Sequence, residues 1–374
     1  MTHVLVTGGA GFVGSHIVDE YVDAGYDVTV VDNLTDQVHE SEPDYLNDDA
    51  EYVWGDIRDR ELMTDLLESA DVLNHQASAV GVGQSMYEIE KYVDVNTLAT
   101  ARVLDIVVNE EIDLERMVVA SSMSIYGEGR YRCPTCGETR HPSPREDGQM
   151  ARGEWEHRCA ECDTALEPEP TPESKPREST SIYAITKKDQ EEMCLSIGRA
   201  YDIPTVALRY FNIFGSRQAL DNPYTGVCAI FSSRIKNDNP PLIFEDGQQT
   251  RDFVHVSDVA RANRLATESD ATDMAINIGS GSPTSIEAVA DTLIDLYGKD
   301  EELAPEIAND YRQGDIRHCF ADTTRAASEI GFEAEFGFEE GMRELVEWGL
   351  DQDAEDRFEE AHSELESKGL VGED

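Results

Sequence analysis

The feature that most constrains the fold is a glycine-rich turn at residues 7–14, which joins a short β-branched run to a helical pattern that reaches about Ala24. Strand, glycine turn and helix in this order form the phosphate-binding unit of a dinucleotide-binding fold. The glycines allow a tight turn and a close approach of the backbone to a pyrophosphate, and the start of the helix then faces the phosphates. We expect cofactor contacts from the following residues of this unit: Gly8, Gly11, Phe12, Val13 and Gly14.

Acidic and polar residues follow the next three expected strands, at residues 27–31, 51–55 and 71–74. The first of them, Asp32, lies where a carboxylate can accept hydrogen bonds from both ribose hydroxyls and repel a 2′-phosphate, which favours NAD over NADP. Ligands of open α/β sheets bind outside the carboxyl ends of the strands. We interpret His75 as a packing residue. The remaining expected cofactor contacts are Asn33, Asp56, Ile57, Gln76, Ala77 and, on an expected helix over 87–108, Asn96.

The stretch 181–187 places a phenol and an ammonium four residues apart on an expected helix, where Tyr183 and Lys187 share one face. A tyrosine titrates near pKa ~10, so its use as a base near neutrality requires a group such as Lys187 that stabilises the phenolate. Ser122 follows an expected strand at the nicotinamide edge of the sheet, where its hydroxyl could orient a substrate hydroxyl. The simpler alternatives are a surface tyrosine with a solvated lysine, and a serine that caps the next turn.

Four of the seven cysteines form two Cys-x-x-Cys pairs with 22 residues between the pairs. They lie in an expected insertion at about 128–176, which is rich in proline, glycine and charge and cannot build a core of its own. Two such knuckles can offer four thiolates to one structural Zn²⁺, whose binding would supply folding energy. A closed four-cysteine site has no open position, so we assign it no chemistry. Free thiols are one alternative, and replacement of a thiolate by His141 or His157 is another; the expected ligands are Cys133, Cys136, Cys159 and Cys162.

The chain carries 78 acidic and 30 basic residues, a formal net charge of −48. Acidic residues dispersed along an otherwise ordinary globular sequence indicate a halophilic protein of a high-salt cytosol, because molar salt screens charges over ~3 Å. An acidic partner-binding surface is the alternative. The same charge would repel nucleic acid. We expect neither a leader peptide nor a membrane span, because no basic segment with an apolar run opens the sequence and no apolar run approaches ~20 residues. We expect a cytoplasmic protein with no nucleic-acid or membrane partner.

Read in this order, the glycine turn, Asp32, Asp56, the stretch 121–127 and Tyr183-x-x-x-Lys187 resemble the extended short-chain dehydrogenase/reductase superfamily. Within it, the sequence is similar to nucleotide-sugar epimerases and dehydratases. The resemblance extends from residue 3 to about 348, apart from the insertion. It implies an NAD-dependent enzyme that acts on a nucleotide sugar.

The resemblance also implies an α/β fold with a doubly wound parallel Rossmann sheet and a smaller C-terminal α/β substrate domain. We place the NAD-binding domain at 1–204, the mostly substrate-binding part at 205–348, partly interleaved with the Rossmann sheet, and an acidic tail at 349–374. The tail has apolar residues at helical intervals and is interpreted as a peripheral helix without a function. A homodimer through the helices at Tyr87 and Tyr183 is a further implication.

The family roles carried onto matching positions are a catalytic set and a sugar-diphosphate site. The resemblance implies catalysis by Ser122, Tyr183 and Lys187, with the last two also contacting the cofactor. Two arginines would pair with the diphosphate, which suits so acidic a protein because an anion needs dedicated cations. The expected substrate residues are Ser122, Asn212, Arg251, Arg312 and Asp315.

The residues after Ser122 bear on the choice of reaction. Family dehydratases carry Asp-Glu there, and decarboxylating members usually show Glu at the second position, whereas this chain has Met123 and Ser124. We therefore favour C4 epimerisation of a pyrimidine-diphospho-hexose over dehydration or decarboxylation. Val80 stands where UDP-galactose 4-epimerases typically have Lys, which leaves the sugar open between dTDP-L-rhamnose and UDP-glucose/galactose types. An NAD-binding sensor or scaffold is the non-enzymatic alternative.

Overall fold

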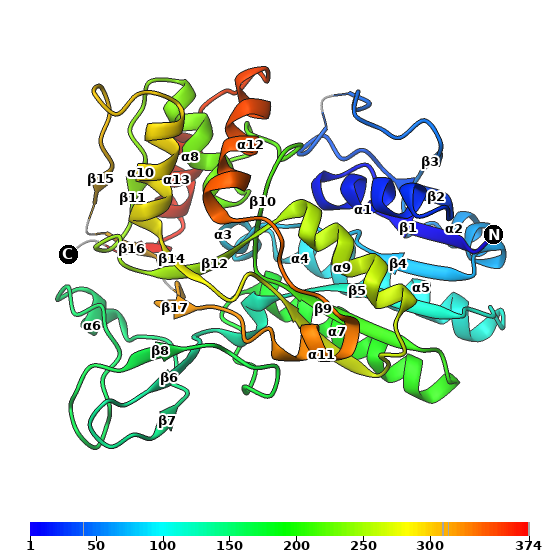
Figure 1. Ribbon diagram of the computed structural model, residues 1–374, viewed down its shortest axis with the longest axis horizontal. Helices are drawn as coiled ribbons and strands as arrows, with labels where there is room; N and C mark the ends of the chain where they lie inside the picture. Colours follow the sequence, from blue (N-terminus) through cyan, green and yellow to red (C-terminus); the bar gives the residue numbers. More distant parts are fainter. Residues whose placement is uncertain (40, 309, 313, 373–374) are drawn as a thin grey trace.

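The computed structural model describes residues 1–39, 41–308, 310–312 and 314–372 (Figure 1). At its centre lies a 7-stranded sheet in the order β13-β9-β5-β4-β1-β2-β3, in which every pair of neighbours is parallel. The order reverses beside β1, as in doubly wound dinucleotide-binding sheets. The expected α/β fold class is therefore confirmed. No helix among the described residues is long and apolar enough to cross a membrane.

Strands and helices follow one another along the whole of the described chain. The strands are β1 (His3–Thr7), β2 (Asp27–Asp32), β3 (Glu51–Trp54), β4 (Val72–His75), β5 (Arg116–Ser122), β6 (Arg130–Arg132), β7 (Thr139–Arg140), β8 (Glu167–Glu169), β9 (Thr205–Tyr210), β10 (Asn212–Phe214), β11 (Leu242–Ile243), β12 (Thr250–His255), β13 (Met274–Ile278), β14 (Pro283–Ser285), β15 (Glu306–Ile307), β16 (Tyr311–Arg312), β17 (His318–Cys319) and β18 (Val371–Gly372). The helices are α1 (Phe12–Asp23), α2 (Arg60–Ser69), α3 (Val82–Ser85), α4 (Ile89–Tyr92), η1 (Val93–Leu98), α5 (Ala99–Asn109), η2 (Met123–Tyr126), α6 (Asp147–Met150), α7 (Ile182–Tyr201), α8 (Val227–Lys236), α9 (Val256–Glu268), α10 (Ile286–Leu296), α11 (Thr324–Ile330), α12 (Phe338–Leu350) and α13 (Phe358–Ser367).

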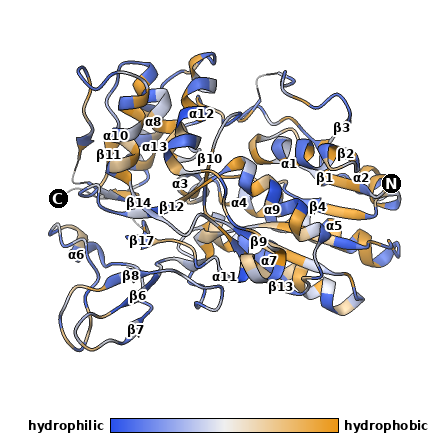
Figure 2. Ribbon diagram, in the orientation of Figure 1, coloured by the Kyte–Doolittle hydropathy of each residue, from blue (hydrophilic) through white to orange (hydrophobic). Residues whose placement is uncertain are grey.

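Helices cover both faces of the central sheet. On one face, α2, α5 and α7 bury a cluster that includes Leu5, Leu73 and Val119. On the other face, α1 and α9 pack side by side over Val4, Val6 and Val30. Strands buried on both sides are apolar along their whole length, and Figure 2 shows the hydrophobic residues concentrated on them.

One expected element differs from the structure, and the run 205–215 contains a break between two sheets. It forms two strands: β9 belongs to the central sheet and β10 pairs with β12 in a second sheet. The break falls at Phe211, whose ring is buried in a separate cluster with Met123 and Tyr126, so the chain leaves the first sheet there. The helix predicted over 87–108 begins at Ile89 and contains the π-helical turn η1.

The second layer of structure lies beside the carboxyl ends of the central strands. β10, β12, β14 and β17 form a small mixed sheet, and α8, α10 and α12 bury an apolar cluster around Phe214 and Leu293. The insertion forms a separate three-stranded sheet, β7-β6-β8, on the lower left of Figure 1. Its small core contains Tyr131, Leu166 and two of the cysteines.

The acidic tail does more than the sequence predicted. Its helix α13 buries Phe358, Ala361 and Leu365, and β18 pairs antiparallel with β16. Glu364 accepts hydrogen bonds from the hydroxyls of Tyr87 (3.1 Å) and Tyr224 (3.0 Å). The tail forms the predicted helix and buries its apolar positions, and it also contacts residues of both layers. Periodicity predicted the apolar face of α13 but not its partners, which lie far away in the chain.

Candidate active site

The glycine turn between β1 and α1 is closed against its neighbours at two of its glycines. Gly8 has φ +72°, and a Cβ there would lie 2.8 Å from Ala77 Cα. A Cβ on Gly14 would lie 2.1 Å from the Gly8 carbonyl oxygen. Only glycine fits these two positions, whereas Gly11 is open, with no such atom closer than 3.5 Å. The backbone at Gly11 is thus accessible at the N-terminus of α1, where Phe12 and Val13 begin the helix.

Asp32 ends β2 and is held beside this turn. Its Oδ2 accepts a hydrogen bond from Ala10 N (3.1 Å), and its Oδ1 accepts one from Leu34 N (2.9 Å). The carboxylate is therefore fixed next to the glycine turn, as the sequence predicted. The side-chain amide of Asn33 donates a hydrogen bond to the carboxylate of Asp56 (3.1 Å).

Asp56 is already paired within the chain. Arg58 binds it through Nε (2.8 Å) and through a second nitrogen (2.6 Å), and these hydrogen bonds lower the pKa of Asp56 to about 2. Ile57, next to it, is buried. The side chain of Asp56 is thus an ion-pair partner, and its main chain stays at the carboxyl end of β3.

The two residues after β4 have different surroundings: Ala77 lies at the glycine turn, and the side chain of Gln76 lies in a network of buried amides. Ala77 N donates to Thr7 Oγ1 (3.1 Å) beside Gly8. Gln76 points inward, where its amide donates to Asn263 (3.1 Å) and accepts from the hydroxyl of Tyr210 (3.1 Å). The structure therefore brings Ala77, rather than the side chain of Gln76, to the glycine turn.

Ser122 ends β5, and Tyr183 meets it from α7, the helix that also carries Lys187. Tyr183 lies in the first turn of α7, which Ser181 caps by accepting from Ala184 N (3.1 Å). Burial raises the pKa of Tyr183, and its hydrogen bond with Ser122 partly offsets that rise. The two hydroxyls are thus adjacent, as the sequence predicted, and Tyr183 keeps part of its side chain accessible.

Lys187 is buried one turn along α7, with 2% of the residue exposed. Burial lowers its pKa to about 7, while Cys194 and Glu191 oppose that effect. Below it, His75 bonds Thr7 (2.8 Å) and Thr100 (2.9 Å) through its two ring nitrogens. Burial, with a smaller effect of Lys187, lowers the pKa of His75 to about 3, so the ring is neutral. These contacts agree with the interpretation of His75 as a packing residue.

Asn96 lies in η1 and connects two parts of the site. Its Oδ1 accepts from Ala79 N (2.7 Å), and its Nδ2 donates to Ala79 O (3.0 Å) and Thr186 Oγ1 (3.0 Å). The side chain therefore fixes the loop after β4 against the catalytic helix. Its contacts within the chain are to that loop and to α7.

The expected substrate residues come from β10, β12 and the segment around β16. Asn212 Oδ1 is buried without a hydrogen-bond partner among the described residues. Arg312 stacks on Phe244 at 4.1 Å, and its Nε also lacks a partner among them. Burial lowers the pKa of Arg312, and nearby Asp315 opposes this. A desolvated guanidinium without a hydrogen-bonded anion is a candidate anion site.

Arg251 differs, because its guanidinium donates to main-chain carbonyls. The acceptors are Thr250 (2.9 Å), Ile316 (2.6 Å) and Arg317 (3.1 Å). The sequence did not foresee this, nor the stacking of Arg312 on Phe244. Both depend on residues far apart in the chain.

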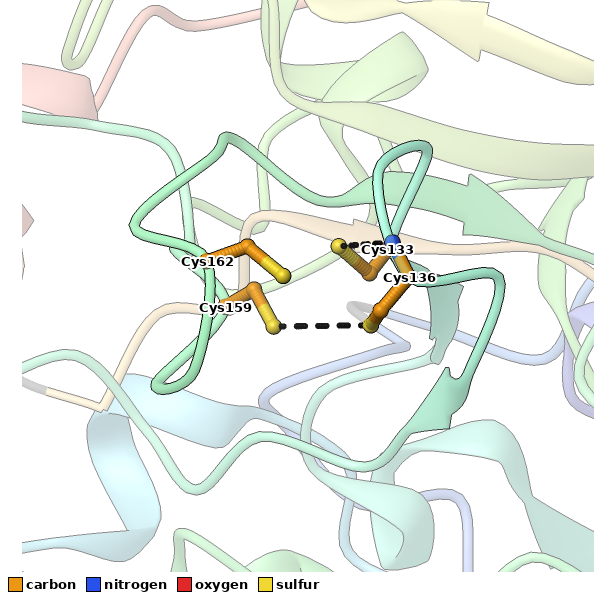
Figure 3. A group of neighbouring side chains, drawn as sticks. All are labelled: Cys133, Cys136, Cys159 and Cys162. Atoms are coloured by element: carbon orange, nitrogen blue, oxygen red, sulfur yellow. Dashed lines mark hydrogen bonds between the residues drawn. The ribbon is translucent and has the colours of Figure 1, made fainter.

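The four expected zinc ligands come together between two loops of the insertion (Figure 3). Their sulfur atoms all lie within 4.8 Å of one another, and those of Cys136 and Cys159 are 4.0 Å apart. A tetrahedral Zn²⁺ with bonds of about 2.3 Å requires sulfur separations of about 3.8 Å, so the donor set fits the ion. Neither alternative histidine belongs to this group, and His157 instead bonds Glu128 (3.0 Å).

The fold and these side chains define a class: α/β proteins with a dinucleotide turn and a serine–tyrosine–lysine set at the same sheet edge. The chain belongs to the NAD dependent epimerase/dehydratase family, whose sequence profile matches residues 4–147 and 160–279.

Individual relatives agree with this membership. The chain is 33% identical over 351 residues to dTDP-L-rhamnose 4-epimerase of Burkholderia thailandensis, with 92% of this chain and 94% of the relative covered. UDP-glucose 4-epimerase of Thermotoga maritima, solved with UDP-glucose, superposes with a TM-score of 0.74 at 29% identity and covers 93% of this chain and 98% of its own. UDP-glucose 4-epimerase of Thermus thermophilus, solved with NAD, gives a TM-score of 0.74 at 27% identity, with 94% and 100% covered.

Proposed function

We propose that this protein is an NAD-dependent epimerase that inverts C4 of a pyrimidine-diphospho-hexose of the dTDP-L-rhamnose or UDP-glucose type. The observation that carries the proposal is the hydrogen-bonded pair of Ser122 and Tyr183, with Lys187 one turn further along α7 and without an acid at positions 123 and 124. Met123 is buried, and the hydroxyl of Ser124 donates to Ser122 (2.9 Å). The site can start an oxidation at C4 but lacks the carboxyl groups that elimination requires. The relatives that are 4-epimerases support the same choice.

The glycine turn and Asp32 together fit NAD. Gly8 and Gly14 are closed by neighbouring backbone, Gly11 is open to a pyrophosphate, and Asp32 is placed to accept from a ribose. When bound, NAD would accept the C4 hydride and return it to the opposite face of the 4-keto sugar. We assign cofactor contacts to the predicted set: Gly8, Gly11, Phe12, Val13, Gly14, Asp32, Asn33, Asp56, Ile57, Gln76, Ala77, Asn96, Tyr183 and Lys187.

The chain's own residues then have distinct tasks. Ser122 orients the sugar 4-hydroxyl, and Tyr183 removes its proton. Lys187 stabilises the phenolate by its charge, four residues along the same helix face. Tyr183 returns the proton after the sugar has turned over, so no net oxidation occurs.

The nucleotide must stay bound while the sugar turns. We assign this anchoring to Asn212, Arg251, Arg312 and Asp315. The supporting observation is that Asn212 and Arg312 each carry a buried polar atom without a partner among the described residues. A diphosphate and its sugar would satisfy those atoms, since buried polar groups are normally hydrogen-bonded.

The test is incubation of the purified protein and NAD with UDP-glucose, UDP-galactose and dTDP-L-rhamnose, followed by NMR of the C4 configuration. Conversion is expected for one of them, and Tyr183→Phe should lower kcat by about 10²–10⁴-fold. Tyr201→Phe, an exposed tyrosine at the other end of α7, is the matched control and should leave the rate unchanged. The proposal fails if every substrate keeps its configuration, as a sensor would leave it, or if Tyr183→Phe retains full activity.

We further propose that the four cysteines bind one structural Zn²⁺ and that the protein is a homodimer. For the dimer, the support is a set of exposed apolar residues on packed helices: Ile89 at 49%, Val93 at 42% and Ile185 at 43%. Burial of such residues drives association. Light scattering should give a dimer mass that Ile185→Glu reduces to a monomer.

The high-salt cytoplasm remains our proposed setting, supported by the net charge of −48. Salt screening should stabilise such a chain against its own repulsion. We expect the melting temperature to rise between 0.1 M and 2 M KCl. No rise would contradict a halophilic adaptation.

A further inference from the structure

The insertion contacts the part of the chain that carries the proposed diphosphate arginines. Arg312 lies in β16, Arg251 lies in β12, and β12 pairs with β17 at the end of the segment formed by residues 311–312 and 314–318. The insertion, residues 128–176, packs against this segment. This inference rests on the proposed function, because it assigns the insertion a task in substrate binding.

The position of Arg251 depends on the segment's main chain. Two of its hydrogen bonds are to the carbonyl oxygens of Ile316 (2.6 Å) and Arg317 (3.1 Å). A displacement of this backbone would therefore displace the guanidinium, because Thr250 O would be left as the single one of its three carbonyl acceptors.

Residues of the insertion hold that backbone directly. Glu128 accepts from Arg317 N (2.8 Å), and Arg145 donates to Asp315 O (3.1 Å). The side chains of Glu128 and Arg145 are fully buried. The hydroxyl of Tyr131 also accepts from His318 N (3.1 Å).

A partly buried ion network makes the same connection through side chains. Arg317, 1% exposed, binds Glu156 of the insertion (2.6 Å) together with Glu245 (3.0 Å) and Asp246 (2.6 Å). Arg145 reaches across from the insertion to Glu245 (2.7 Å). Charges removed from water require their partners in good geometry. The network therefore permits one relative position of the insertion and the segment.

Apolar packing extends the contact to β16. Met150 and Trp155 of the insertion form a buried cluster with Tyr311, the residue before Arg312. The insertion thus holds both ends of the segment: Arg317 by ion pairs and Tyr311 by apolar packing.

We propose that the insertion is a positioning module for the diphosphate end of the substrate site, in which Glu128, Arg145 and Glu156 hold the segment 315–317 and, through it, Arg251. These three are positioning residues and take no part in proton transfer. The module should therefore govern affinity for the second phosphate of the nucleotide and leave the chemistry at Tyr183 unaffected.

The test measures Kd for UDP and UMP, and for dTDP and dTMP, by calorimetry in high salt on the full chain with zinc and NAD bound. Arg145→Gln and Glu156→Gln should weaken diphosphate binding about tenfold, the loss of one charge-assisted hydrogen bond. Monophosphate and NAD affinities should change less than about threefold. In the epimerase assay KM should rise while kcat is preserved.

Arg152→Gln is the matched control, since Arg152 lies in the same insertion, is exposed, and bonds Glu154 and the carbonyl oxygen of Gly148 at the surface. Arg145→Lys should restore part of the diphosphate affinity. If Arg145→Gln does not fold, Glu156→Gln decides, because Glu156 is 40% exposed and tolerates the change. Equal diphosphate affinity in a folded variant, or equal losses for mono- and diphosphates, would overturn the inference. Binding of UDP or dTDP by wild type without epimerisation would instead overturn the proposed function.

Discussion

Replacement of Lys187 by methionine should stabilise the cofactor-free protein while it abolishes activity. Lys187 is 2% exposed, and burial lowers its pKa from 10.5 to about 7. Each tenfold loss of proton affinity corresponds to about 1.4 kcal/mol. Holding the charged ammonium in the folded state therefore costs about 5 kcal/mol at low pH, an upper value that relaxation of the site reduces.

The lowered pKa of Lys187 determines in which direction the stability of wild type changes with pH. Below pH 7 the lysine is protonated in both folded and unfolded states, and the folded state carries the whole cost. Between pH 7 and 10.5 the unfolded state binds more protons, so the stability of wild type rises with pH. Above 10.5 the cost is gone. Methionine does not titrate. The gain in free energy of unfolding of Lys187→Met over wild type is therefore largest below pH 7 and becomes smaller at higher pH.

Urea unfolding of both proteins at constant high salt and at pH 6, 8 and 10 measures this difference. The free-energy gap should shrink by up to about 1.4 kcal/mol for each pH unit above 7. Lys188→Met, at the next and more exposed position, is the control and should show no such gap. A gap for Lys187→Met that is constant with pH would refute the reasoning.

Three further predictions follow from other contacts. Asp32→Asn should raise affinity for NADP relative to NAD by about tenfold, measured by fluorescence titration, because the carboxylate no longer repels a 2′-phosphate; an unchanged ratio contradicts the role of Asp32. Cys159→Ser should lower bound zinc from about one ion per chain towards none, measured by elemental analysis, whereas Cys228→Ser should retain it. Arg209→Met should destabilise the fold by about 3–5 kcal/mol, measured by urea unfolding, because Glu191, 1% exposed, loses its bidentate partner at 2.6 Å and 2.9 Å; a loss below about 1 kcal/mol would contradict this.

The sequence predicted those parts of the site that depend on local pattern. Glycine spacing predicted the turn, the i, i+4 spacing predicted the shared face of Tyr183 and Lys187, and the knuckle spacing predicted the four-sulfur cluster. Each depends on residues close together in the chain or on the shared edge of parallel strands, so local rules were sufficient.

The remaining features depend on contacts between distant segments. Nothing in the run 205–215 indicated that Phe211 would carry the chain into a second sheet. Two of the three carbonyl acceptors of Arg251 lie 65 and 66 residues away. The tail helix packs on residues more than a hundred positions earlier, as Glu364 does on Tyr224. Such contacts depend on tertiary packing, and no short stretch of the sequence predicts which distant segments pack together.

The order of strands in the central sheet has a consequence for biosynthesis. β5 ends at Ser122, but its outer neighbour β9 and the edge strand β13 come much later, the last ending at Ile278. At roughly 5–20 residues per second, a ribosome needs roughly 10–30 s to make this stretch. Until β9 has been made, β5 has one unpaired edge, and until α9 has been made, α1 lacks its cover. The yield of native protein in a foreign host should therefore depend on how this nascent edge is protected, by chaperones or by salt, as much as on the stability of the finished fold.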